Sequence, residues 1–231
     1  MKKQIIAIGG GGFARDYGKR LIEQYILEQS TQKKPNICFV PTASGDNEAY
    51  KVDFYSAFSQ LNCTPAHLDF FKQTPDLEKL IENQDIVYVG GGNTKSMIAV
   101  WKDWGLDKIL KAAYNRGVIM CGVSAGAICW FKKGITDSWS DELHIMDCLG
   151  FVDGNCCPHY DEETARRPSL HKFIDQGDLS SCFAIDGGCA LHLIDGKPQL
   201  AVAFNNKKNS YTVDKPNEKV MEHAFTKKDI S

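Results

Sequence analysis

The sequence predicts an α/β fold in which a mostly parallel, doubly wound sheet is flanked by helices, with antiparallel strands toward the C-terminus. Three observations support this prediction. Short β-rich runs ending in glycine or turn residues recur, a helical segment follows each of them, and hairpin-like runs replace this alternation beyond Phe131. Alternating strands and helices give parallel pairing with both sheet faces covered. Ligands in such sheets bind at loops after the carboxyl ends of strands.

Five runs form the predicted parallel strands. They read QIIAIGGGG, NICFVPTAS, AHLDFF, DIVYVGGGN and VIMCGVS. Apolar residues near helical spacing predict helices between them. These residues are Tyr17, Leu21, Tyr25 and Leu27 within 15–29, and Tyr50, Phe54, Phe58 and Leu61 after the second run. A third helix is predicted over Leu106–Arg116, where Gly117 is a suitable C-cap.

The pattern changes in the second half of the chain. KKGITDSWSDELH is polar and predicted to be irregular, whereas FVDGNCCPHY approaches an extended run. TARRPSLHKFIDQG predicts a helix after Pro168. CFAIDGG, ALHLIDGKPQLAVAF and NSYTV predict antiparallel strands with a turn over 195–198. The final segment, KPNEKVMEHAFTKKDIS, is polar and expected at the periphery.

Length and composition favour a single domain over residues 1–231. The chain has 43% hydrophobic and 24% charged residues, as ordinary globular domains do. Its 27 basic and 29 acidic side chains leave no general attraction to nucleic acid or anionic lipid, so a small-molecule partner is expected. Without an apolar run of about 20 residues or a signal-like N-terminus, we expect no membrane association and a cytoplasmic location. Nine cysteines should then mostly remain thiols.

Two glycine-rich loops follow predicted strands. The first, Gly9–Ala14, satisfies the relaxed dinucleotide fingerprint G-x-G-x-x-A, but the second strand ends without the acid that would hold a ribose. Its alternative interpretation is a tight turn between strand and helix. The second loop, Gly90–Thr94, could expose backbone N–H groups to an oxyanion, and its Asn or Thr could also cap the next helix.

Residues 122–126 read GVSAG and fit the nucleophile-elbow pattern G-x-S-x-G. VIMC supplies an apolar strand before Ser124, and AGAICWF predicts a helix after it. In this context Ser124 is a candidate nucleophile, and the N–H of Ala125 would join a donor from Gly91 or Gly92 in an oxyanion hole. The alternative is a buried serine in a glycine-rich crossover.

A serine nucleophile needs a base, and five histidines follow the elbow. They are His144, His159, His171, His192 and His223. His159 has the best setting, because CPHYD follows a possible strand that would bring it to the carboxyl edge. Cys156, Cys157 and His159 lack the second ligand pair of a zinc site, so no metal is expected.

A carboxylate should orient the histidine. Asp186 in FAIDGG ends a predicted strand that could lie beside His159, and Asp137 in GITDSW lies in the loop after the elbow. Each aspartate could equally be a turn former.

The motifs GGGNT, GVSAGA and CPHYD, in this order and at these intervals, resemble the peptidase E family of serine peptidases, which includes cyanophycinase. The likeness extends from the N-terminal strand to FAIDGGCALHL. It implies a fold similar to class I glutamine amidotransferases, with serine where those enzymes have cysteine at the elbow. It also implies hydrolysis of peptides, in particular dipeptides, after an N-terminal aspartate, with no metal or other cofactor.

The resemblance assigns roles residue by residue. It makes Ser124 the nucleophile and His159 the base. Gly91 or Gly92, together with Asn93, becomes an oxyanion or substrate contact.

ETARRP resembles the family's arginine-bearing stretch, which implies that Arg166 or Arg167 pairs with the aspartyl carboxylate. The alternative for these arginines is a solvated helix start. Where family enzymes can carry a glutamate, this chain has Gly187, which favours the neighbouring Asp186 as the orienting acid over Asp137.

Two other functions stay open at this point. A serine esterase or another amidase could share the elbow, and an α/β-hydrolase would use a later histidine such as His223. A non-catalytic nucleotide-binding protein could instead use the N-terminal glycine loop. The pattern is compatible with a monomer or a homodimer.

Overall fold

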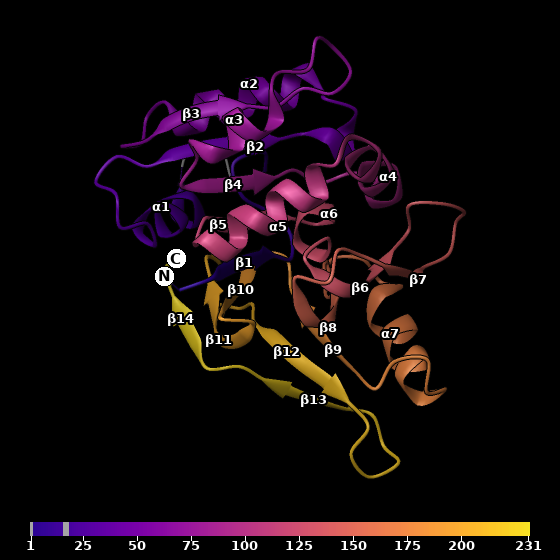
Figure 1. Ribbon diagram of the computed structural model, residues 1–231. Coiled ribbons are helices and arrows are strands. Elements are labelled where there is room, and N and C mark those ends of the chain that lie inside the picture. Colours follow the sequence, from indigo (N-terminus) through magenta and orange to yellow (C-terminus); the bar gives the residue numbers. More distant parts are fainter. Residues whose placement is uncertain (1, 16–18) are drawn as a thin grey trace.

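The computed structural model describes residues 2–15 and 19–231, which form two β-sheets, with most helices packed around the larger sheet and the last helix against the smaller one (Figure 1). The larger sheet contains, in spatial order, β14 (Lys227–Asp229), β11 (Lys197–Ala203), β10 (Cys189–Ile194), β1 (Gln4–Ile8), β5 (Ile119–Val123), β4 (Ile86–Val89), β2 (Asn36–Val40) and β3 (Thr64–His67). The smaller sheet contains β13 (Met221–Ala224), β12 (Ser210–Asp214), β9 (Ser181–Ile185), β8 (Val152–Cys157), β6 (Phe131–Thr136) and β7 (His144–Asp147).

The helices mostly connect strands of the larger sheet. They are α1 (Leu21–Glu28), the 3-10 turn η1 (Thr42–Ser44), α2 (Glu48–Phe58), α3 (Leu77–Glu82), α4 (Thr94–Trp104), α5 (Leu106–Arg116), α6 (Ala125–Ile128) and α7 (Arg166–Asp175). The predicted helix over Leu106–Arg116 is confirmed and ends at Gly117, whose φ is 97°. The helix predicted within 15–29 begins only at Leu21, and its Tyr17 lies outside the described residues.

Strands β1, β5, β4, β2 and β3 pair in parallel, which confirms the predicted parallel sheet. Alternate residues of these strands face opposite helical layers. Ile6 and Ile8 of β1 pack in one buried cluster with residues of α1 and α2, whereas Ile5 and Ala7 pack in another with α4 and α5. The parallel part of the sheet is therefore doubly wound.

Antiparallel strands extend this sheet beyond β1. Strand β10 pairs antiparallel with both β1 and β11, and the β10–β11 hairpin turns at Asp195 and Gly196, as predicted. Both turn residues have positive φ, which is typical of tight hairpin turns. The C-terminal segment lies at the periphery, as expected, and contains two exposed edge strands, β13 of the smaller sheet and β14 of the larger.

The segment after the elbow differs from the sequence prediction. Helix α6 ends at Ile128, so the predicted helix AGAICWF is a single turn followed by β6. The predicted irregular segment contains β6 and β7 instead. Lys132 is exposed and Lys133 half-buried within β6, and β7 lies at the sheet edge, so the period-2 apolar signal of a strand is weak here.

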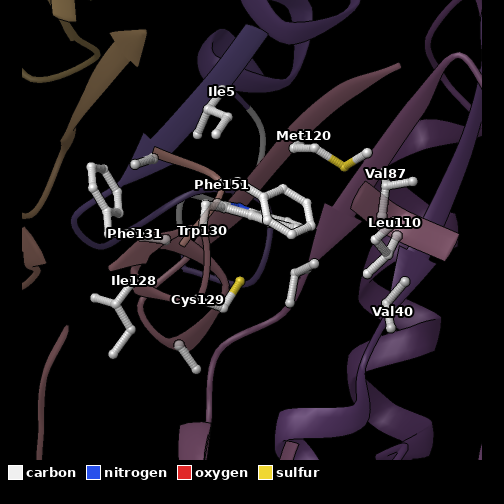
Figure 2. Packing of buried hydrophobic residues seen from close by; sticks show 14 of the residues in the cluster. Ile5, Val40, Val87, Leu110, Met120, Ile128, Cys129, Trp130, Phe131 and Phe151 are labelled. Atoms are coloured by element: carbon white, nitrogen blue, oxygen red, sulfur yellow. The ribbon is translucent and has the colours of Figure 1, made fainter. Parts of the chain in front are cut away.

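A continuous core joins the two sheets (Figure 2). Trp130, which directly precedes β6, and Phe131, its first residue, belong to the same buried cluster as Ile5 and Met120 of the larger sheet. The rings of Trp130 and Phe151 lie 5.3 Å apart. This shared core supports our proposal that residues 1–231 form one domain. Within residues 2–15 and 19–231, no helix has the length and apolarity needed to cross a bilayer.

Candidate active site

Ser124 occupies a strained turn between β5 and α6. Its backbone has φ 58° and ψ −112°, in the positive-φ region that non-glycine residues rarely adopt. The turn is held because the Ser124 N–H donates to the Ile8 carbonyl at 3.1 Å, and the Ser124 carbonyl accepts from Ala127 and Ile128. Strain of this kind persists where surrounding structure enforces it and is typical of functional sites.

Strand β4 lies so close to the elbow that Gly122 and Gly126 have no space for a side chain. A Cβ on Gly122 would lie 2.5 Å from the Val89 carbonyl oxygen, and a Cβ on Gly126 would lie 2.1 Å from the same atom. Both distances are far shorter than a van der Waals contact. The G-x-S-x-G pattern therefore records the close approach of the elbow to its neighbouring strand.

His159 lies in a second strained turn, two residues after β8. Its φ is 52°, and its N–H donates to the Gly9 carbonyl at 3.0 Å. Together with Ser124 it lines a pocket of about 430 Å³ at the carboxyl edge of the larger sheet. Among the described residues, no hydrogen bond links the two side chains, as is common in catalytic pairs before substrate binds.

The carboxylate that meets His159 belongs to Glu162. Its Oε2 lies 2.8 Å from His159 Nδ1, and His159 is buried. In the neutral imidazole Nδ1–H donates to this carboxylate, which leaves Nε2 as the acceptor. The same Oε2 accepts a hydrogen bond from Arg15 Nη1 at 3.2 Å.

Glycine backbones make room for Glu162. A Cβ on Gly187 would lie 2.0 Å from Glu162 Cδ, and a Cβ on Gly10 would lie 2.5 Å from Glu162 Oε2 and 2.9 Å from His159 Nδ1. A Cβ on Gly9 would meet the Asp186 carbonyl oxygen at 2.3 Å. The N-terminal glycine loop therefore packs directly against His159 and Glu162, in addition to forming the turn expected from the sequence.

The predicted orienting aspartates lie elsewhere. Asp186 Oδ2 accepts from the Asn209 N–H at 3.0 Å and the Tyr211 hydroxyl at 3.3 Å, and burial raises the pKa of this carboxyl. Asp137 is exposed and lies 3.5 Å from Arg166. Within residues 2–15 and 19–231, neither aspartate forms a hydrogen bond or ion pair with His159, and the carboxylate that does so is that of Glu162, so the geometry does not support the expected pairing.

Glu162 is not among the acids predicted from the sequence, which were Asp186 at a strand end and Asp137 in the loop after the elbow. The signal was present in HYDE, where an acid stands three residues after the histidine. The left-handed His159 turns the chain so that the N–H of Glu162 bonds to the His159 carbonyl, which places the two side chains together.

Backbone N–H groups are available beside Ser124. Gly91 and Gly92 line the pocket, and Ala125 follows the serine. Of the described backbone, the N–H groups of Ala125 and Gly92 have no protein acceptor, whereas Gly91 N–H donates to the Tyr50 hydroxyl at 3.3 Å. Burial raises the pKa of Tyr50 to about 12, so its phenol stays protonated.

Asn93 is occupied with structural bonds. Its Oδ1 accepts from the Ser96 N–H at 2.9 Å and caps α4, and its Nδ2 donates to the Ser138 carbonyl. Its own N–H bonds to the Ala43 carbonyl at 2.7 Å. The capping interpretation of the GGGNT loop therefore describes Asn93, and a direct substrate contact is not supported.

Neither predicted substrate arginine lines the pocket. Arg166 is buried and holds Glu163 at 2.6 Å and the Ile135 carbonyl at 2.9 Å. Arg167 stacks 4.5 Å from the Tyr160 ring and pairs with Glu222. Their positions correct the expectation that one of them binds a substrate carboxylate.

The remaining histidines have partners outside the pocket. His144 stacks on Trp139, His171 pairs with Glu222, His192 bonds to Tyr25, and His223 lies 3.5 Å from Asp214. Cys156 and Cys157 are buried with free thiols. Over the residues that the structure describes, no group of three His, Cys, Asp or Glu side chains is arranged to hold a metal ion.

Comparison with known proteins decides the family. Residues 5–201 match the profile of peptidase family S51. The chain belongs to this family. It is 47% identical to the uncharacterized peptidase YgaJ of Bacillus subtilis (strain 168) over 212 residues, covering 91% of this chain and 92% of that protein. Haemophilus influenzae peptidase E is 25% identical over 173 residues, covering 69% and 77% of the two chains.

Two solved structures support the fold of this S51 peptidase. A peptidase from an acI-B1 actinobacterium has a TM-score of 0.74 at 18% identity and covers 98% of this chain and 95% of its own. A putative peptidase E protein from Listeria monocytogenes EGD-e has a TM-score of 0.64 at 20% identity, covering 86% and 98%. The resemblance inferred from GGGNT, GVSAGA and CPHYD is confirmed, and the chain is a peptidase of this fold.

Proposed function

We propose that this S51 peptidase hydrolyses short peptides through Ser124 as nucleophile, His159 as general base and Glu162 as the carboxylate that orients the imidazole. One observation carries the proposal. A serine held in a strained elbow shares a pocket with a histidine whose Nδ1 is fixed on a carboxylate at 2.8 Å. That arrangement leaves the other ring nitrogen free to accept the serine proton.

The chemistry follows from these positions. His159 Nε2 takes the Ser124 proton while Oγ bonds to the scissile carbonyl carbon, and the carbonyl π electrons move to its oxygen. The N–H groups of Ala125 and Gly92 face this oxyanion. The C–N bond then breaks as the imidazolium returns its proton to the leaving amine. Water, deprotonated by the same nitrogen, releases the acyl group and regenerates Ser124.

The charges of the pocket support a small substrate with a free amino terminus and an acidic first residue. Arg15 and Asp53 both line it with Ser124, and both act on the buried Tyr50 phenol through their charge. A guanidinium binds a carboxylate, and the Asp53 carboxylate, which has no ion pair among the described residues, suits an ammonium group. We therefore propose dipeptides with N-terminal aspartate as the substrates.

The test is a hydrolysis screen of Asp-Leu, isoAsp-Leu, Glu-Leu and Ala-Leu with native protein and with Ser124→Ala. We expect native protein to cleave Asp-Leu fastest and Ser124→Ala to cleave none of them. If a folded native sample cleaves no dipeptide, the substrate proposal is wrong. If Ser124→Ala retains activity, the nucleophile is wrong. An unrelated outcome, nucleotide retained by purified protein without any hydrolysis, would favour the non-catalytic alternative.

A further inference from the structure

One carboxylate oxygen accepts from two side chains in this site. Glu162 Oε2 lies 2.8 Å from His159 Nδ1 and 3.2 Å from Arg15 Nη1. A carboxylate that also bonds to a guanidinium stabilises a developing imidazolium less, because its charge is shared and the two cations repel each other. With the pocket empty, Arg15 therefore weakens the partner that His159 needs during proton transfer.

Arg15 is well placed to leave Glu162. Its side chain is 60% exposed, whereas that of Glu162 is 33% exposed and that of His159 is 7% exposed. The backbones of Gly10 and Gly187 lie close to the Glu162 side chain, so its carboxylate has little room to follow the arginine. An exposed surface pair of this kind contributes little to stability and exchanges partners readily.

Among the described residues, Arg15 is the only cation that lines the pocket with Ser124 and His159. Three other basic side chains considered for this role have acidic partners of their own. Arg166 and Arg167 hold Glu163 and Glu222 respectively, and Lys208 pairs with Asp161.

We propose that Arg15 is the residue that binds the substrate's acidic side chain, and that this binding withdraws it from Glu162 and leaves Glu162 to His159 alone. The inference rests on the proposed function and adds a coupling to it. A substrate carboxylate replaces Glu162 as the acceptor of the guanidinium. Acidic substrates thereby bind more tightly and turn over faster. With neutral substrates Arg15 stays bonded to Glu162, so Glu162 stabilises the His159 imidazolium less.

The test compares Asp-Leu with its neutral isostere Asn-Leu in native protein and in Arg15→Met, which keeps the chain length but removes the charge. We expect kcat/KM for Asp-Leu to fall about 10- to 100-fold, the range for a lost charge-assisted hydrogen bond. In the same variant, kcat for Asn-Leu should rise several-fold, because Glu162 no longer shares its charge. Arg167→Met is the matched control and should leave the Asp-Leu to Asn-Leu ratio unchanged.

Two results would overturn this inference. Native kcat/KM for both substrates in Arg15→Met means that Arg15 does not bind the substrate carboxylate. An equal fall for both substrates means that Arg15 has only a structural role. Phosphonylation of Ser124 by a fluorophosphonate separates these results from failure of the proposed function, since it requires no peptide cleavage. The coupling predicts faster phosphonylation in Arg15→Met than in native protein, and equal or slower labelling contradicts it.

Discussion

Replacing Gly187 with alanine should disable the site through a single displaced side chain. The new Cβ would lie 2.0 Å from Glu162 Cδ, while ordinary contacts begin near 3.4 Å. The carboxyl must therefore move by about 1.4 Å, which breaks a 2.8 Å hydrogen bond to His159. Gly187 does not have a positive φ, so alanine causes no backbone strain of its own.

The size of the effect follows from losing the orienting carboxylate. Removing such a group from a serine triad lowers kcat by about 10⁴-fold, so we expect kcat of Gly187→Ala to fall about 10³- to 10⁴-fold with a smaller change in KM. Glu163→Gln, which changes the neighbouring acid that pairs with Arg166, is the matched control and should change kcat much less.

A double-mutant cycle of Gly187→Ala and Glu162→Ala tests whether the alanine acts through the Glu162 side chain. In a Glu162→Ala background the side chain that Gly187→Ala displaces is already absent. The second substitution should then change kcat by less than about twofold. Multiplicative effects of the two substitutions would refute the steric argument, and so would a Gly187→Ala enzyme with native kcat.

Three further predictions concern stability, each measured by urea unfolding. Gly126→Ala places a Cβ 2.1 Å from the Val89 carbonyl oxygen, so the free energy of unfolding should fall by about 2 to 3 kcal/mol; an unchanged value contradicts the elbow packing. Ser124→Gly relieves the strain of φ 58° and should raise that free energy by about 1 kcal/mol, and a loss of stability would contradict the strain. Burial lowers the pKa of His192 to about 4, and the two nitrogens of its neutral ring form hydrogen bonds with Tyr25 and Gln4. The neutral imidazole contributes fully to the free energy of unfolding above the unfolded-state pKa of about 6.5, and this contribution is lost as the pH falls toward 4. Between pH 7 and pH 5 the free energy of unfolding should therefore fall by about 2 kcal/mol more in native protein than in His192→Gln.

The sequence predicted the parts of the molecule whose signals are local. The G-x-S-x-G pattern located Ser124 because each glycine is fixed by the nearby backbone of β4. The alternation of apolar runs predicted the parallel sheet, because strands buried on both faces are almost entirely apolar. His159 was a candidate because CPHYD follows an extended run, which is β8 of the smaller sheet, and the turn after it brings His159 to the pocket that Ser124 lines.

The parts that were missed depend on tertiary contacts. Strands β6 and β7 carry polar residues on an exposed face, so their sequence lacks a clear period. Glu162 meets His159 only because a non-glycine residue adopts a positive φ, which no propensity predicts. Arg166 was a plausible ligand by position, yet its guanidinium is buried against the Ile135 carbonyl.

We propose that the His159 imidazole makes Ser124 nucleophilic. Peptide mapping by mass spectrometry after fluorophosphonate treatment tests it directly. We expect one adduct, on Ser124, in native protein, no adduct in Ser124→Ala, and labelling slowed at least about 100-fold in His159→Ala. Equal labelling rates in native protein and His159→Ala, or an adduct on another residue, would contradict the claim.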